Sequence, residues 1–236
     1  MQKITCKKYS NFCIAMLGYF RMSEIVTTYQ LKDLSQPVPM DRDEFYEEQI
    51  ALAKAGEKPT RSVAVVQVLL FTPDGEIMLQ KRSRSKAHNA GMFDKTLGGH
   101  IRFGDSSNYT VLAETLQELS VPSFVLDSKD EFEKTYTLLK GHIRDAAFVY
   151  FVDSKTYNSK KMFDETERAI ANTYYFYLGV FAGSVKPSER EEAGMLYLKK
   201  NLLEEKFESQ KDHFTEDLSY FLSKYSKKID EFVQSL

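Results

Sequence analysis

Residues 98–121 read GGHIRFGDSSNYTVLAETLQELSV, and this pattern is more informative about the fold than any other part of the 236-residue chain. Two glycines open the stretch, a short loop with a carboxylate at Asp105 follows, and the remainder predicts about four turns of α-helix. The apolar residues of that helix recur on one side and predict a face that packs against the rest of the protein: Tyr109, Leu112, Leu116 and Leu119.

The opposite side of the predicted helix carries oxygen ligands. Glu114 and Glu118 stand one turn apart, and Gln117 lies beside them. Like charges at this spacing repel by roughly 0.2–0.5 kcal/mol in a bare helix, and a divalent cation that bridges them removes this cost. Mg²⁺ suits the pair best because it takes a few carboxylates, keeps waters and binds substrate phosphate. A solvated face of an ordinary amphipathic helix is the alternative interpretation.

The spacing resembles the Nudix box, whose pattern is G-x5-E-x7-R-E-U-x-E-E-x-G-U, where U is a bulky aliphatic residue. In this register Gly99 is the opening glycine and Asp105 stands at the first Glu. Glu114 and Glu118 fill two later glutamate positions, and Val121 is the closing aliphatic residue. The chain is therefore similar to the Nudix superfamily over its most informative stretch.

Four positions of the box depart from the pattern. Ala113 replaces the Arg and Thr115 the first aliphatic residue, while Gln117 replaces one of the paired glutamates and Ser120 the closing Gly. Gln117 brings no negative charge to a metal, and Ala113 removes a guanidinium that would orient a neighbouring glutamate. A catalytically impaired ligand-binding or regulatory protein is therefore the alternative to an active hydrolase.

The resemblance continues outside the box, over most of residues 24–222. Residues 62–82 resemble the strand, turn and strand that precede a Nudix box, with Thr-Pro-Asp-Gly as the turn. The run from 84 to 100 is similar to the branch nearest isopentenyl diphosphate isomerase. That branch has Cys-Gly-His where this chain has Gly-Gly-His ending at His100, and the missing catalytic cysteine argues against isomerase chemistry.

The resemblance implies an α/β fold of the Nudix type, an α/β/α sandwich with a mixed sheet. It also implies Mg²⁺-dependent hydrolysis, with Mn²⁺ as a substitute ion, of a diphosphate linkage in a nucleoside diphosphate derivative or related organic diphosphate. Carried over by register, Glu114 and Glu191 are the candidate catalytic carboxylates, with Glu189 and Glu192 as fallbacks for the second. The implied metal ligands are Gly99 through its carbonyl, Glu114, Gln117 and Glu118.

A cationic cluster precedes the glycine loop. Arg82, Arg84 and Lys86 are candidates for holding the second phosphate of a diphosphate, because cations near a metal site neutralise its charge. A solvated strand end is the equally weighted alternative.

The remaining pattern predicts the elements around this centre. An early strand is expected over 24–31, a loop at Pro37 and Pro39, and a helix capped by Asp41 that runs to about Ala55 and suggests no chemistry. Strands are expected over 131–139, 146–153 and 174–182. An insertion near 154–172, helix-like over 164–171, is expected to cover a pocket or mediate dimer contacts. A long C-terminal helix behind Thr215 ends the chain.

Composition limits the class of protein. An apolar content of 42% is ample for a core, and a net charge of −2 gives no reason to expect nucleic acid or membrane partners. Cys6 and Cys13 are the only cysteines, which fits a reducing cytoplasm. Residues 1–22 are expected to be an extension and 23–236 the Nudix domain. The expected partner is a small-molecule diphosphate, and the C-terminal helix is compatible with a homodimer.

Overall fold

The computed structural model describes residues 24–86, 88–163, 166–183 and 192–236, with the side chains of residues 192 and 193 left aside. In chain order, the elements are β1 (Ile25–Gln30), β2 (Asp33–Asp41), α2 (Arg42–Lys54), β3 (Arg61–Phe71), β4 (Ile77–Arg82), β5 (Phe93–Asp94), α3 (Ser107–Leu119), β6 (Ser123–Leu126), α4 (Lys129–Leu139), β7 (Ala147–Phe163), β8 (Thr166–Phe181), β9 (Glu192–Leu198), α5 (Lys200–Ser209), the 3₁₀ turn η1 (Lys211–His213), α6 (Glu216–Lys224) and α7 (Ser226–Gln234).

One mixed sheet runs through the molecule in the order β2-β1-β3-β8-β7-β6, and β4 joins it beside β3 together with β5 and β9. The β3–β8 and β6–β7 pairs are parallel. Strands β3 and β4 pair only where Leu70 meets Met78 and Phe71 meets Ile77, next to the turn that joins them. Farther along β3, the segment before α3 pairs with β3 in place of β4, through bridges at Leu97 and His100. The two strands therefore diverge and leave an opening in the sheet.

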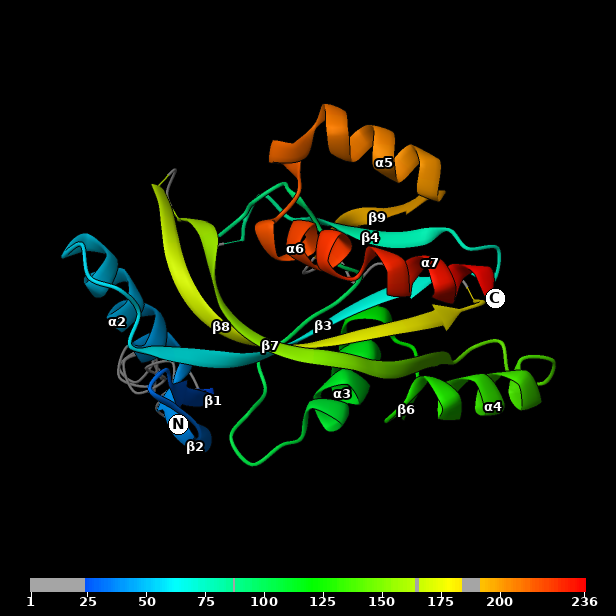
Figure 1. Ribbon diagram of the computed structural model, residues 1–236, viewed down its shortest axis with the longest axis horizontal. Helices are drawn as coiled ribbons and strands as arrows, with labels where there is room; N and C mark the ends of the chain where they lie inside the picture. The colour runs from blue at the N-terminus through cyan, green and yellow to red at the C-terminus, as the bar shows by residue number, and fades with distance from the viewer. Residues whose placement is uncertain (1–23, 87, 164–165, 184–191) are drawn as a thin grey trace, which may run out of the picture.

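Helices cover both faces of this sheet (Figure 1). Strand β3 is buried on both sides, so its alternating side chains supply two separate cores. Val65, Leu69 and Phe71 face α4, α6 and α7, whereas Val66 and Val68 face α3. The predicted α/β/α sandwich with a mixed sheet is confirmed.

Several local predictions are confirmed. The early strand is β1, and α2 begins where Asp41 accepts hydrogen bonds from the backbone N–H groups of Asp43 and Glu44. The turn between β3 and β4 closes through a hydrogen bond from the Gly75 N–H to the Thr72 carbonyl, with Gly75 at φ 77°. Box residues 107–119 form α3. These features depend on neighbouring residues, which the sequence shows directly.

The predicted packing face of α3 is wrong. Tyr109 and Leu116 are more than half exposed, at 57% and 55%, and Leu112 is exposed as well. The buried side is centred on Val111 and Thr115, whose hydroxyl makes a hydrogen bond with Ser123 of β6. The helix carries two overlapping stripes of residues suited to burial, and both include Leu119. Contact with β3 and β6 buries the stripe with Val111 and Thr115, although the apolar periodicity favours the other.

Two other secondary-structure predictions are wrong. Residues 131–139 belong to α4, because Ser128 caps the helix and Phe132 and Tyr136 bury a helical face at i and i+4. Pro37 and Pro39 lie in β2 and not in a loop. Strand β2 is at the edge of the sheet, where a residue without an N–H donor is tolerated.

The expected insertion near 154–172 is not helical in its described part. Strands β7 and β8 continue through it as one long antiparallel hairpin, from Ala147 paired with Phe181 to Phe163 paired with Thr166. Over 157–163 less and more exposed residues alternate, which is the period of a strand. Lys161 and Phe163 face a cleft, so the expectation that this segment covers a pocket agrees with its position.

The predicted long C-terminal helix is two helices. Thr215 caps α6 as predicted, but the helical course breaks at Tyr225, where φ is −111° and ψ is 18°. The apolar stripe packs against the protein's own core as predicted, through Leu218, Phe221 and Phe232. None of the helices in the described part of the chain has the length and apolar character needed to span a bilayer.

Candidate functional site

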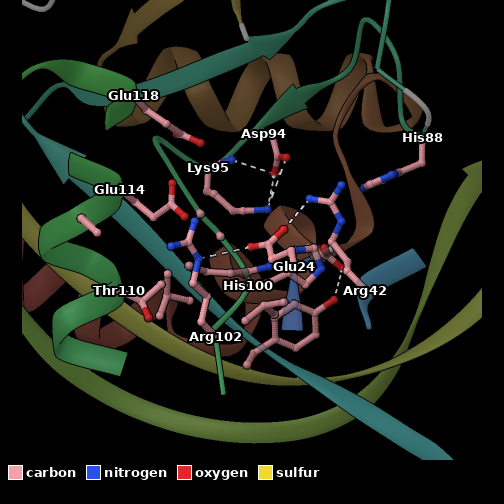
Figure 2. Close-up of a pocket in the computed structure, with 18 of the residues that line it drawn as sticks. Glu24, Arg42, His88, Asp94, Lys95, His100, Arg102, Thr110, Glu114 and Glu118 are labelled. Atoms are coloured by element: carbon pink, nitrogen blue, oxygen red, sulfur yellow. Dashed lines mark hydrogen bonds and ion pairs between the residues drawn. The ribbon is translucent and has the colours of Figure 1, made fainter. Parts of the chain in front are cut away.

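A cleft of about 1700 Å³ occupies the opening between β3 and β4. Its walls come from α3, the loop before α3, strands β3 and β4, helix α2, the far end of the β7–β8 hairpin, and α6 (Figure 2). Large, largely preformed concave sites of this kind usually bind small molecules. We refer to this space as the cleft.

Helix α3 supplies an acidic wall. Glu114 and Glu118 both point from α3 into the cleft (Figure 2), and Gln117 and Ala113 line the same wall. Glu118 is only 8% exposed. The helix begins at the Ser106 hydroxyl, which accepts from the Tyr109 N–H, and it ends where Ser120 adopts a left-handed conformation. The two carboxylates are therefore fixed on a rigid element.

The glycine loop fits closely against this wall. A Cβ atom at Gly99 would lie 1.9 Å from Oε1 of Glu114, so only glycine lets the carboxylate occupy its present position. The Gly99 carbonyl accepts a hydrogen bond from the Val66 N–H at 2.9 Å, which leaves one lone pair for another ligand. The loop is thus bound to β3 and sits directly beneath Glu114.

The facing wall holds a buried carboxylate among cations. Asp94 is 2.9 Å from the Thr215 hydroxyl, 3.0 Å from Arg82 and 3.2 Å from Lys95. Burial disfavours the Asp94 carboxylate, but Lys95 and Arg82 outweigh this effect and hold the pKa of Asp94 well below its ordinary value. This cluster joins β4, β5 and α6 at the edge of the cleft.

The rim carries a second ion-pair group. Glu24 accepts from Arg42 at 2.6 Å and lies 3.9 Å from Arg102 (Figure 2). These residues are the one before β1, the first of α2 and one in the glycine loop. They tie three segments together where the cleft opens.

One part of the cleft is aromatic and polar. Tyr46, from α2, makes a hydrogen bond with Nε2 of His100 at 2.9 Å, and its ring lies 6.2 Å from the ring of His88. Burial and nearby cations, Lys161 foremost among them, lower the pKa of His88 to about 2 and that of His100 to about 3. Both imidazoles are therefore neutral at physiological pH.

The structure brings together most of the residues that the sequence indicated. Gly99, Glu114, Gln117 and Glu118 line one cleft, and Arg82 and Lys86 line it too. Arg84 is exposed on the outside and does not line it. Glu189 and Glu191 lie outside the described residues, and Glu192 is described only through the backbone of β9.

Within the described residues, no three side chains of His, Cys, Asp or Glu lie close enough together to hold a metal ion. The described acidic wall thus consists of two glutamates with amide and carbonyl oxygens beside them. Glu114 and Glu118 are in addition engaged in interactions with the surrounding protein.

Sequence reasoning missed several residues of the cleft. Tyr46 lies on a helix from which no chemistry was expected, and Lys161 and Phe163 lie in the segment taken for an insertion. His88 and Asp94 fall in the run before the glycines without any motif of their own. Lys161 and its neighbour Lys160 point to opposite faces of the strand. The alternation of side chains along a strand was the one sequence signal that would have distinguished the lysine in the cleft from the one outside it.

The fold and the cleft define a mixed α/β protein with an acidic helix facing cationic walls. None of the protein-family models matches the sequence, and none of the curated proteins matches it.

Solved structures similar to this one include the Deinococcus radiodurans protein DR0079, at a TM-score of 0.49 and 14% identity over 69% of this chain and 82% of that one. The MutT protein from Methanosarcina mazei has a TM-score of 0.45 and 20% identity, over 74% and 96% of the two chains. The Nudix domain of Shewanella oneidensis NrtR, solved with ADP ribose, has a TM-score of 0.40 and 13% identity, over 70% and 88%. These likenesses concern the backbone arrangement only.

Proposed function

We propose that this chain is a Nudix-type hydrolase that cleaves a diphosphate linkage in a nucleoside diphosphate derivative or related organic diphosphate. One observation carries the proposal. Glu114 and Glu118 stand one turn apart on α3, face the cleft, and lie against a glycine loop that accepts no side chain at Gly99. Paired carboxylates beside a backbone oxygen are the donor set that a hard divalent cation prefers.

The residues present fit Mg²⁺, or Mn²⁺ in its place. Glu114 and Glu118 would hold the ion, with the Gln117 amide oxygen and the remaining lone pair of the Gly99 carbonyl as neutral donors. Two carboxylates suffice for an ion that keeps several waters and binds substrate phosphate. When bound, the ion would neutralise charge that develops on the phosphoryl group and lower the pKa of a coordinated water.

The chain itself would supply the base and the anion-binding walls. Glu114 is the first candidate for taking a proton from the attacking water, because its carboxylate faces the cleft on a rigid helix. Glu191 is the second candidate. Lys86, Arg82 and Lys95 line the cleft opposite the acidic wall and would hold the second phosphate. The ion pair with Asp94 orients Arg82. The substrate is a small molecule of the cytoplasm, and neither nucleic acid nor a membrane takes part.

The test is Mg²⁺-dependent phosphate release, after coupling to a phosphatase, over nucleoside diphosphate sugars, dinucleoside polyphosphates, nucleotides and isopentenyl diphosphate. Glu118→Gln is expected to lower turnover by about 10²-fold or more, because it removes a charge from the ion. The matched control is Glu133→Gln on α4, an exposed glutamate paired with Lys129 outside the cleft. Equal turnover by Glu118→Gln and the wild type would refute the proposal.

A second candidate is a ligand-binding or regulatory protein of the same fold. The observation in its favour is that Gln117 and Ala113, which replace a Glu and the Arg of the box, line the cleft. In this case the wild type would bind members of the panel without Mg²⁺ and turn none of them over. Turnover that appears only after Gln117→Glu would identify the residue at which catalysis was lost.

A further inference from the structure

One part of the cleft contains a cation that the proposed chemistry does not use. We define the inner chamber by Tyr46, His88, His100, Lys161 and Phe163, which come from four separate segments and line the cleft together. Lys161 is 5% exposed, and its Nζ lies 5.7 Å from the centre of the Tyr46 ring. The rings of His88 and Phe163 lie 5.5 Å apart beside it.

The adjacent lysine shows how unusual this burial is. Lys160 points away on the same strand, is more than half exposed, and pairs with Glu167 at 2.7 Å. In the part of the chain that the structure describes, no carboxylate oxygen lies within 4.0 Å of the Lys161 ammonium, which is the distance limit for an ion pair. Burying an ammonium group without a close counterion costs several kcal/mol, so its retention at this position needs a reason.

The surroundings keep this ammonium charged. Burial works against the charge of Lys161, but Tyr46 and the more distant Asp217 favour it, and the pKa of Lys161 is raised. The Asp217 carboxylate is already bound by the Tyr174 hydroxyl at 2.5 Å. Arg82 and Lys95 are paired with Asp94, so among these three cations Lys161 is the one that no ion pair within the described residues neutralises. The chamber therefore attracts an anion.

A second, independent feature of the cleft also points to ligand binding. Gln67 on β3 lines the cleft and is 1% exposed. Among the described residues, neither its amide nitrogen nor its amide oxygen has a hydrogen-bond partner. An unsatisfied buried amide is costly unless a ligand or water completes it, because a buried donor or acceptor loses its bonds to water.

We propose that the inner chamber is an oxyanion-binding subsite in which the Lys161 ammonium holds a phosphate or carboxylate group of the ligand. Tyr46 and His88 stand beside that group as hydrogen-bonding side chains, and the Phe163 ring next to them suits the apolar part attached to it. The inference rests on the proposed function only in taking this group to be a further anionic group of the same substrate, besides the two phosphates of its diphosphate. Binding of the anion itself requires neither a metal ion nor hydrolysis.

The test uses the full chain with EDTA and constant ionic strength, and two probes, sodium phosphate and sodium acetate. Lysine side-chain ammonium signals are followed by NMR in the wild type, and affinities are measured by calorimetry. The Lys161 signal is expected to shift saturably while the Lys160 signal does not. Lys161→Met is expected to weaken binding at least tenfold, as loss of a charged hydrogen bond does, whereas Lys161→Arg retains binding.

The control is Lys160→Met, which changes the same charge on the same strand outside the cleft and is expected to bind as the wild type does. Tighter binding of phosphate than of acetate would assign the group as a phosphate, and the reverse order as a carboxylate. No saturable shift with either probe, or equal losses in the two methionine variants, would overturn the subsite. Because the NMR signal of the Lys161 ammonium is measured in the wild type, the test remains valid even if Lys161→Met does not fold.

Failure of the subsite and failure of the proposed function are distinguishable. Glu118→Gln is expected to lose hydrolysis and to keep metal-free phosphate binding. If no substrate of the panel is hydrolysed but phosphate still shifts the Lys161 signal, the subsite holds and only the hydrolase proposal fails.

Discussion

The contact between Gly99 and Glu114 allows a sharp test of the acidic wall. The backbone at Gly99 does not need the left-handed region, so alanine is compatible with its conformation. The added Cβ would lie 1.9 Å from Oε1 and 2.4 Å from Cδ of Glu114. The three nearest atoms all belong to this one flexible side chain, which must retreat because real Cβ contacts are not shorter than 3.0 Å.

The movement required of Glu114 sets the size of the expected loss of activity. Glu114 must withdraw by about 1 Å or more, and a misplacement of that size in a catalytic constellation costs about 10²-fold in rate. Gly99→Ala is therefore expected to lower kcat about 10²-fold. Stability should change by less than about 1 kcal/mol, since alanine also reduces the entropy of the unfolded chain.

The assays are turnover on the best substrate of the panel, Mn²⁺ affinity by electron paramagnetic resonance without substrate, and urea unfolding. Gly98→Ala serves as a comparison for stability only, because its Cβ would lie 2.6 Å from Cε of Lys95 and 2.7 Å from the Val66 carbonyl oxygen, a backbone atom that cannot rotate away. We expect that variant to lose about 1–3 kcal/mol of stability. Unchanged turnover together with unchanged Mn²⁺ affinity in Gly99→Ala would refute the placement of Glu114 at the ion.

Three further predictions concern stability. Asp94→Asn should lose about 3–5 kcal/mol at pH 7, because it leaves buried cations uncompensated. The folded-state pKa of Asp94 lies below 3.8, so its contribution is present above that pH and is lost as the pH falls; urea unfolding should show a smaller difference at pH 3 than at pH 7. His88 and His100 have folded-state pKa values of about 2 and about 3 against 6.5 when unfolded, so the unfolded chain binds more protons below pH 6.5. Stability should fall by about 1–2 kcal/mol per histidine between pH 7 and pH 5, and a His100→Gln variant with an unchanged slope would contradict this. Gln67→Met should raise the free energy of unfolding of the ligand-free protein by about 1–3 kcal/mol in urea, and an unchanged or lower value would contradict this.

Much of the fold follows from short-range pattern. The caps at Asp41 and Thr215 and the turn before Gly75 each depend on a few consecutive residues, and each forms as predicted. The acidic wall belongs to the same class, because Glu114 and Glu118 share a helix and their spacing alone places them on one side.

The sequence by itself determined the local elements of this protein and the pairing of its two glutamates, because i and i+4 contacts need no knowledge of the rest of the fold. Only the tertiary structure decided which stripe of α3 is buried, since two stripes compete and the sheet selects one. It also decided that Tyr46, His88 and Lys161 share one chamber. These residues lie far apart in the chain, and the long hairpin that brings them together is held by strand pairing between distant segments.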